Sequence, residues 1–283
     1  MLVSGYRRRP LLRGGPTRGS LAPLGHHPTP PSPAPTWSSI CATNTPEEIR
    51  FIARLAGRSV EDVLRQLQEA GLGTMPGMAA EILVEEVRRI LCPEKLTTGE
   101  WVEVTRAAHR VGLRTTATIM YGHVETPWHR LQHLEVVRNL QRETGGFTEF
   151  VLLPFQVEHN TPGKYFGIRR PLTPEDSLRF TAYCRLYFGA DSPNIQTSWV
   201  KLGPAGVAES RRWGANDFGG TLMEELLTRM NGANHGQNPE PQEIEAVIRS
   251  VGRTPKERDT VYRPVVSRPR DHELGLVKSG ARS

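Results

Sequence analysis

The sequence predicts an α/β protein whose five parallel strands form an open, curved sheet covered by helices. The clearest strand is the Thr-rich, largely apolar stretch 113–121, which lies between Gly112 and Gly122. It does not alternate between polar and apolar residues, as is typical of strands buried on both faces. Shorter strands recur between helices, an order that indicates βα units with right-handed crossovers. Five such units are three fewer than a closed eight-stranded barrel requires.

The ordered part is predicted to begin at residue 45, where Thr-Pro-Glu-Glu forms a capping box with proline at the first helical position. A second helix starts at Ser59 and ends at Gly71, and the glycine-rich stretch 71–77 is the first strand by position. The later predicted elements are helices 78–91 and 97–111, the central strand, helix 127–142, strand 147–155, a helix from 173, strand 195–202, a short helix after Pro204, strand 215–218, a helix after Gly220 and helix 241–251.

Residues 1–44 are dense in Pro, Gly, Ser and Arg, a composition that predicts a disordered leader packing against nothing. The leader is either an organellar transit peptide or sequence carried along by a misplaced start codon. The predicted barrel segment spans 45–255, and 256–283 is predicted to be a loose C-terminal tail. The organisation is therefore one α/β unit between two irregular ends.

Charge and cysteine content narrow the functional classes. The net charge is +6, and five arginines in the leader account for most of it, which leaves about +1 for the rest. A nucleic-acid surface is not expected on a nearly neutral fold, and no apolar run is long enough to span a bilayer. Cys41, Cys92 and Cys184 lie too far apart to indicate a disulfide framework or a zinc ribbon. We expect a cytoplasmic protein, or an organellar one if the leader is a transit peptide.

Four segments of the chain resemble one known family. They are Ala-Gly-Leu-Gly-Thr-Met-Pro-Gly-Met-Ala-Ala-Glu-Ile-Leu at 70–83, Thr-Ile-Met-Tyr-Gly-His-Val-Glu-Thr at 118–126, Ser-Trp-Val-Lys-Leu-Gly-Pro at 198–204 and Asn-Asp-Phe-Gly-Gly-Thr-Leu-Met at 216–223. Over roughly residues 45–262 the chain resembles the second, tyrosine-using subunit or half of FO synthase, a radical S-adenosylmethionine (SAM) enzyme. The resemblance implies a partial, open radical SAM barrel of TIM type, made of about the last five βα units.

The resemblance implies a transferase that joins the 4-hydroxybenzyl group of L-tyrosine to 5-amino-6-ribitylaminouracil in deazaflavin (coenzyme F420 precursor) biosynthesis. The family uses SAM and a 4Fe-4S cluster held by Cys-x-x-x-Cys-x-x-Cys, a spacing that this sequence lacks. The chain is therefore expected to be inactive alone, and a partner chain could supply the missing barrel strands. The alternatives are another radical SAM enzyme of menaquinone (futalosine) biosynthesis and a non-catalytic fragment that only binds a ligand or a partner.

The resemblance also implies site residues, although no catalytic residue is assigned. The candidates for SAM binding are Thr118, Met120, Gly122 and Glu125, aligned with a Gly-x-Ile-x-Gly-x-x-Glu pattern, and Pro154. The substrate candidates are His123, Gln196, Trp199, Asn216 and Asp217, whose strands are expected to end at one mouth. The alternative is that these are loop, rim and core residues. His129 and His133 are spaced like metal ligands but have no third partner, so we predict a surface helix and no metal site.

Overall fold

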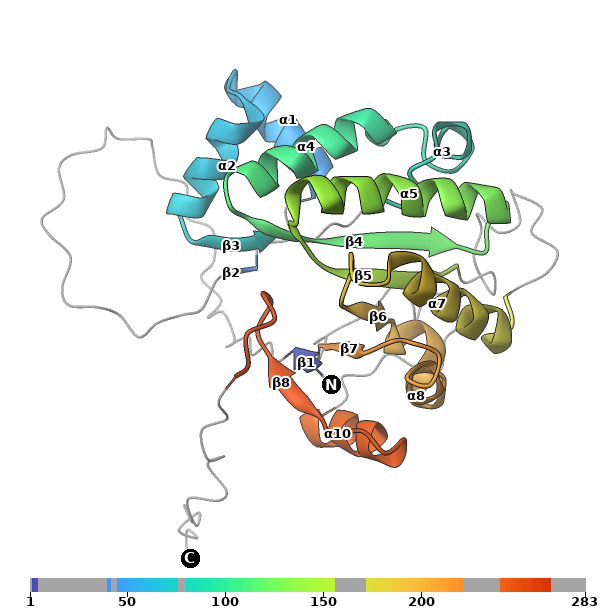
Figure 1. The fold of residues 1–283 in the computed structure, drawn as a ribbon. Coiled ribbons are helices and arrows are strands. Elements are labelled where there is room, and N and C mark those ends of the chain that lie inside the picture. The colour runs from blue at the N-terminus through green and yellow to red at the C-terminus, as the bar shows by residue number, and fades with distance from the viewer. Residues whose placement is uncertain are drawn as a thin grey trace, which may run out of the picture.

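The computed structural model describes residues 2–4, 40–41, 45–75, 80–155, 172–220 and 240–265. The described strands form one sheet in the order β2-β3-β4-β5-β6-β7-β1-β8, and every strand pair is parallel. The strands are β1 (Leu2–Ser4), β2 (Ile40–Cys41), β3 (Leu72–Met75), β4 (Arg114–Tyr121), β5 (Phe147–Pro154), β6 (Ile195–Thr197), β7 (Asp217–Gly220) and β8 (Lys256–Arg258). Within the described residues β2 and β8 are the sheet's two edges, so the barrel is open (Figure 1).

The five predicted strands are confirmed as β3 to β7, in chain order and parallel. Short strands also occur within the stretches predicted as leader and tail: 2–4 pairs with β7 and β8, 40–41 pairs with β3, and 256–258 is the edge strand β8. Segments of two or three residues carry too little periodicity to be recognised in a sequence. They form strands here because the edge of a parallel sheet offers unpaired N–H and C=O groups.

Helices cover the outer face of the sheet (Figure 1). They are α1 (Pro46–Ala56), α2 (Val60–Glu69), α3 (Glu85–Leu91), α4 (Thr98–Arg110), α5 (Pro127–Thr144), α7 (Pro174–Phe188), α8 (Trp199–Ser210) and α10 (Pro241–Ser250). Capping boxes begin α1, α4, α5 and α7, with Thr45, Thr97, Thr126 and Thr173 as the N-caps. Each threonine side chain accepts one of the N–H groups that a first helical turn leaves unpaired. Among the described residues no helix combines the length and apolar character needed to cross a membrane.

Residues 80–84 of the predicted helix 78–91 are not helical, and α3 begins only at Glu85. Arg88 explains the change, because its buried guanidinium donates to the carbonyl oxygens of Ala80 at 2.6 Å and Ile82 at 3.2 Å. Carbonyls bonded in this way are not available to an α-helix. The Glu81 carbonyl instead accepts from the Met120 N–H at 2.8 Å, which holds the segment beside β4.

The two faces of the sheet differ in character. The outer face packs Ile119, Tyr121 and Phe150 into an apolar core with α5 and α7. Paired residues in parallel strands share a face, so the register places residues 118 and 120 of β4 with 151 and 153 of β5 on the inner face. Residues 196 of β6 and 217 of β7 continue that face. Polar candidates for a site therefore gather on the inner, concave side.

Candidate functional site

The loop that follows β4 is closed around the carboxylate of Glu125. Its buried side chain accepts hydrogen bonds from the Gly122 N–H at 2.6 Å, the His123 N–H at 2.8 Å and the Arg130 Nε at 2.7 Å. Burial raises the pKa of this carboxyl, but the contacts with His123, the Gly122 N–H and the Arg130 charge outweigh burial and lower the pKa to about 2. Glu125 is therefore a buried anion that shapes the loop.

His123 also bonds within the loop. Its Nε2 lies 3.0 Å from the Met120 carbonyl oxygen, which can only accept, so Nε2 carries hydrogen. The Nδ1 atom lies 2.8 Å from the Val124 nitrogen and 3.0 Å from Glu125 Oε2. Both side chains were expected to face a ligand, whereas their polar atoms bond to the loop itself. The loop does lie at the carboxyl end of β4, as predicted.

Gly122 is required at this position for two physical reasons. Its φ of 91° lies in the left-handed region, and an added Cβ would stand 2.3 Å from Cδ1 of Leu172. We expect Gly122→Ala to lower the free energy of unfolding by about 1–3 kcal/mol, from overpacking together with backbone strain. Gly112→Ala is the matched control for urea unfolding, since φ is 85° there and nothing lies within 4 Å of the added Cβ. Equal losses in the two variants would contradict the overlap with Leu172.

Three of the other candidates share the inner face. Thr118 and Met120 lie on β4, and Gln196 lies two strands away on β6. Gly219 of β7 leaves room for the Gln196 amide, because a Cβ there would lie 2.9 Å from Nε2. Pro154 is buried at the end of β5 and pairs with Tyr121, on the outer face. Side chains from β4 and β6 therefore line one face of the sheet, with Thr118 and Gln196 at the same level across β5.

Trp199 does not line the inner face. β6 ends at Thr197, so the predicted strand 195–202 was wrong beyond that point and Trp199 begins α8. Its ring is buried with apolar residues of α8, β7 and α10, and its Nε1 donates to the Gly220 carbonyl at 3.1 Å. The tryptophan is therefore a core residue whose indole donor is satisfied.

Asn216 and Asp217 were predicted to end a strand, and Asp217 pairs with Gln196 on the inner face. β7 begins at Asp217 and does not end there. The Asn216 side-chain oxygen accepts from the Ile195 N–H at 2.8 Å and from Arg185 Nη2 at 3.0 Å. Asp217 is completely buried on the inner face. Both residues fasten strands together in this structure.

Asp217 belongs to a buried cluster that the sequence analysis missed, here called the inner cluster: Glu149, Asp217, Arg258 and Tyr262. Arg258 donates from Nε to Asp217 at 2.7 Å and from Nη2 to Glu149 at 3.1 Å. The Tyr262 hydroxyl lies 2.5 Å from Glu149 Oε2 and 2.6 Å from Asp217 Oδ2. Figure 1 shows the turn after β8 reaching toward β5. One signal could have revealed the cluster, since a glutamate inside an apolar strand needs a buried partner.

Metal ligands do not gather in the described part of the chain, where no group of three His, Cys, Asp or Glu residues could hold an ion. His133 is fully buried and accepts from the Leu83 N–H at 2.9 Å, so the predicted surface helix was wrong for that residue. His129 pairs with Glu86 at 2.6 Å.

The two cysteines described with their side chains, Cys92 and Cys184, are free and buried, and burial raises the pKa of both thiols.

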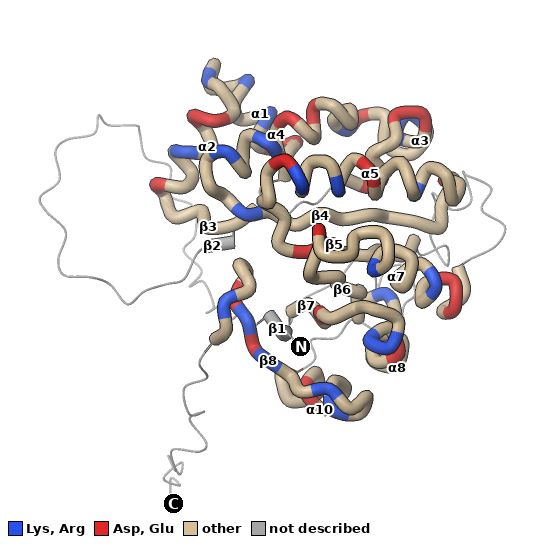
Figure 2. Tube along the Cα trace, in the orientation of Figure 1, with Lys and Arg blue, Asp and Glu red and all other residues tan. Residues whose placement is uncertain are grey.

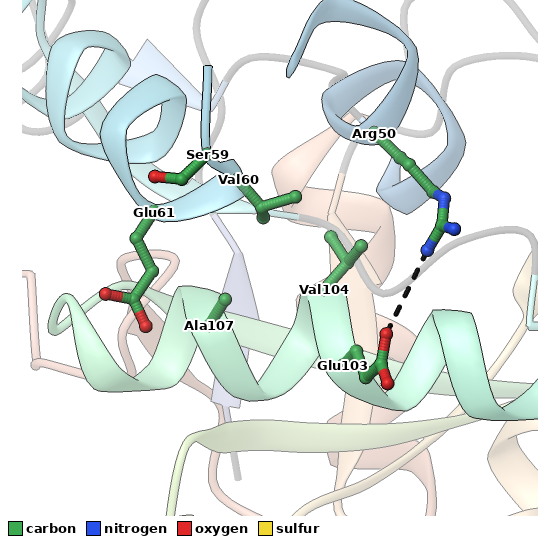
Figure 3. Close-up of a pocket in the computed structure, with 7 residues that line it drawn as sticks. All are labelled: Arg50, Ser59, Val60, Glu61, Glu103, Val104 and Ala107. Carbon is green, nitrogen blue, oxygen red and sulfur yellow. Dashed lines mark ion pairs between the residues drawn. The ribbon is translucent and has the colours of Figure 1, made fainter. Parts of the chain in front are cut away.

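A hollow of about 340 Å³ lies on the helix side of the sheet, between α1, α2 and α4 (Figure 3). It is lined by Arg50, Ser59, Val60, Glu61, Glu103, Val104 and Ala107. Acidic and basic residues are interspersed along the helices around it (Figure 2). The hollow shares no residue with the inner face or with the loop after β4.

Comparison with known proteins agrees with the sequence motifs. The chain is 50% identical over 222 residues to the 5-amino-6-(D-ribitylamino)uracil--L-tyrosine 4-hydroxyphenyl transferase of Methanothermobacter thermautotrophicus. It is 46% identical over 249 residues to the enzyme of that name from Gloeobacter violaceus. The resemblance to the tyrosine-using half of FO synthase is confirmed. The family model "CofH/MqnC C-terminal region" matches residues 144–270, which contain the whole inner cluster.

These transferases are longer than this chain. The match covers 78% of the chain and 60% of the Methanothermobacter transferase, and 84% and 61% for the Gloeobacter one. Solved structures agree in fold. Methylornithine synthase (PylB) is similar with a TM-score of 0.51 and 18% identity, over 82% of this chain and 65% of that one. The FeFe-hydrogenase maturase HydG of Carboxydothermus hydrogenoformans has a TM-score of 0.53 and 15% identity, over 72% and 47%.

Proposed function

We propose that this chain forms part of the SAM and substrate walls of a transferase that joins the 4-hydroxybenzyl group of L-tyrosine to 5-amino-6-(D-ribitylamino)uracil. The observation that carries the proposal is the 50% identity over 222 residues to a transferase named for those two substrates. The open parallel sheet supports it, because its concave face presents side chains at the carboxyl ends of the strands, where barrel enzymes bind their ligands.

The inner face gives the proposed assignments. SAM would lie along Thr118, Met120 and the Gly122 turn, with Glu125 holding the loop in shape. Met120 and Gln196 are half-buried on strands two apart, so one ligand crossing β5 could touch both. Bound SAM would supply the radical-forming group. Of the predicted substrate residues, Gln196 would hydrogen-bond the pyrimidine through its side-chain amide.

The residues of this chain do not fit the iron-sulfur cluster. A cluster needs several thiolates gathered at one place, whereas Cys92 lies at the end of α3 and Cys184 lies within α7. The sequence has three cysteines and none of them is in Cys-x-x-x-Cys-x-x-Cys spacing. We therefore propose that the chain is inactive alone and acts with a polypeptide that supplies cluster ligands and the remaining strands.

Complementation tests this proposal. The purified chain with SAM and dithionite should form no 5′-deoxyadenosine. Adding the separately expressed cluster-bearing segment of the Methanothermobacter transferase, reconstituted with iron and sulfide, should yield coupled product from tyrosine and the uracil. Gln196→Ala should reduce that yield at least tenfold, whereas the exposed Glu175→Gln should not. Formation of 5′-deoxyadenosine by the chain alone would refute its inactivity. A stable complex that binds both substrates without coupling them would favour the non-catalytic alternative.

A further inference from the structure

The distances within the inner cluster indicate that one of its two carboxyl groups is protonated. The Tyr262 oxygen lies 2.5 Å from Glu149 Oε2 and 2.6 Å from Asp217 Oδ2. A phenol has a single hydrogen and can donate to only one of them, while an ionised carboxylate can only accept. Two oxygens at hydrogen-bond distance with no hydrogen between them repel each other. The second short contact therefore requires a hydrogen on one of the carboxyl groups.

Glu149 is the better place for that hydrogen. Asp217 accepts two further bonds, from Arg258 Nε and from the Gly219 N–H, both at 2.7 Å, so each of its two oxygens already accepts from an N–H donor. Among the described residues, the one N–H donor bonded to the Glu149 side chain is Arg258 Nη2, at the longer distance of 3.1 Å. Burial is the main cause that raises the pKa of Glu149 to about 7, and the negative charge of Asp217 adds to it against the opposing Arg258 charge.

The charged and titratable groups around the cluster come from several elements. Glu149 comes from β5, Asp217 from β7 and Arg258 from β8, while Tyr262 lies in the turn that follows. Arg211, at the end of α8, is buried, and its positive charge acts on Asp217 and Tyr262. The Arg211 guanidinium has no hydrogen-bond partner within the described residues. Its charge therefore favours negative charge in the cluster, but it does not determine which carboxyl group is ionised.

The turn after β8 depends on this cluster for its attachment. Tyr262 has a φ of 66°, a left-handed conformation that costs free energy for a residue with a side chain. Asp259 closes the turn by accepting from the N–H groups of Val261 at 2.9 Å and Arg263 at 2.8 Å. The Tyr262 hydroxyl then ties the turn to two strands of the sheet. The strained backbone persists because both of these contacts are made.

We propose that the hydrogen shared by Glu149, Tyr262 and Asp217 is a pH-dependent latch that fastens the turn at 259–263 to the inner face of the sheet. With the hydrogen present, Tyr262 bonds to both carboxyl groups. Without it, one short contact becomes repulsive, and the strained turn at Tyr262 gains freedom to leave. The latch does not depend on the proposed transferase activity, and it would open the concave side next to β7.

Hydrogen exchange of the full chain tests the latch. The pKa of Glu149 is about 7 when the turn is closed, and it returns toward the ordinary value of 4.5 when the turn opens. Between these two pH values the closed state therefore binds one more proton than the open state. Protection of the Val261 and Arg263 amides, corrected for intrinsic exchange, should fall about tenfold per pH unit in that window and level off above it. Glu149→Gln keeps a hydrogen donor at all pH values and should abolish the slope. The exposed Glu175→Gln should retain it.

Two results would overturn the proposal: a wild-type slope of zero, or an unchanged slope in Glu149→Gln. Infrared spectroscopy of the wild-type chain covers the case in which Glu149→Gln does not fold. A carbonyl band of a buried, protonated carboxyl should be present at pH 5.5 and lost by pH 9, with a midpoint near 7. Absence of that band at pH 5.5 would equally refute the shared hydrogen.

Discussion

Arg258→Ala is expected to lower the free energy of unfolding by about 3–5 kcal/mol, because it removes the only cation bonded to two buried carboxyl groups in the described structure. The guanidinium is 3% exposed, so water cannot replace it at Glu149 and Asp217. It also lies 3.8 Å from the centre of the Tyr262 ring, a contact that the substitution would remove as well. The expected measurement is the midpoint of urea unfolding at neutral pH.

Two further variants separate the loss of a buried charge from the loss of any guanidinium and from the loss of its fixed donor geometry. Arg249→Ala removes a guanidinium from an exposed pair on α10 and should cost less than about 1 kcal/mol. Arg258→Lys keeps the charge but cannot present two donors in fixed geometry, so an intermediate loss is expected. A loss below about 1 kcal/mol for Arg258→Ala would show that the inner cluster does not hold β8 to the sheet.

The strands and helices that could be predicted from the sequence are those with local signals. Thr45 and Thr97 begin capping boxes that need only three following residues, and both cap the predicted helices. The long central strand could be recognised from its own composition. β1, β2 and β8 have two or three residues each, and they form strands because neighbouring strands offer free backbone groups. Short segments of this kind have no separate signal in a sequence.

The candidate site was predictable in position and less so in detail. The loop at His123 and Glu125 does follow β4, since glycine and the capping Thr126 fix both ends. The predicted strand was 215–218, whereas β7 is Asp217–Gly220, so Asp217 begins the strand instead of lying near its end. Its partner Arg258 is 41 residues away, and Glu149 is 109 residues from Arg258. Contacts across such separations are set by packing of the whole sheet and lie outside any local window.

Acid is expected to unfold the loop after β4 through Glu125. The pKa of this carboxyl is about 2 in the folded chain against an ordinary value of 4.5, because the His123 contacts, the Gly122 N–H and Arg130 outweigh the effect of burial. A lowered pKa contributes stability that is fully present above pH 4.5 and is lost as the pH falls toward 2. The difference corresponds to roughly 3 kcal/mol.

Glu125→Ala should therefore cost about 3–5 kcal/mol near neutral pH, since it leaves the partly buried Arg130 and two N–H groups unpaired. The wild-type chain should lose stability between pH 4.5 and 2, and the Glu125→Ala variant should lose much less. The free energies of unfolding of the two chains should therefore converge as the pH falls. Glu103→Gln, at an exposed position on α4, is the control and should follow the wild-type curve. If Glu125→Ala and the wild type stay equally far apart at pH 6 and pH 2.5, the carboxylate is not the charged anchor of this loop.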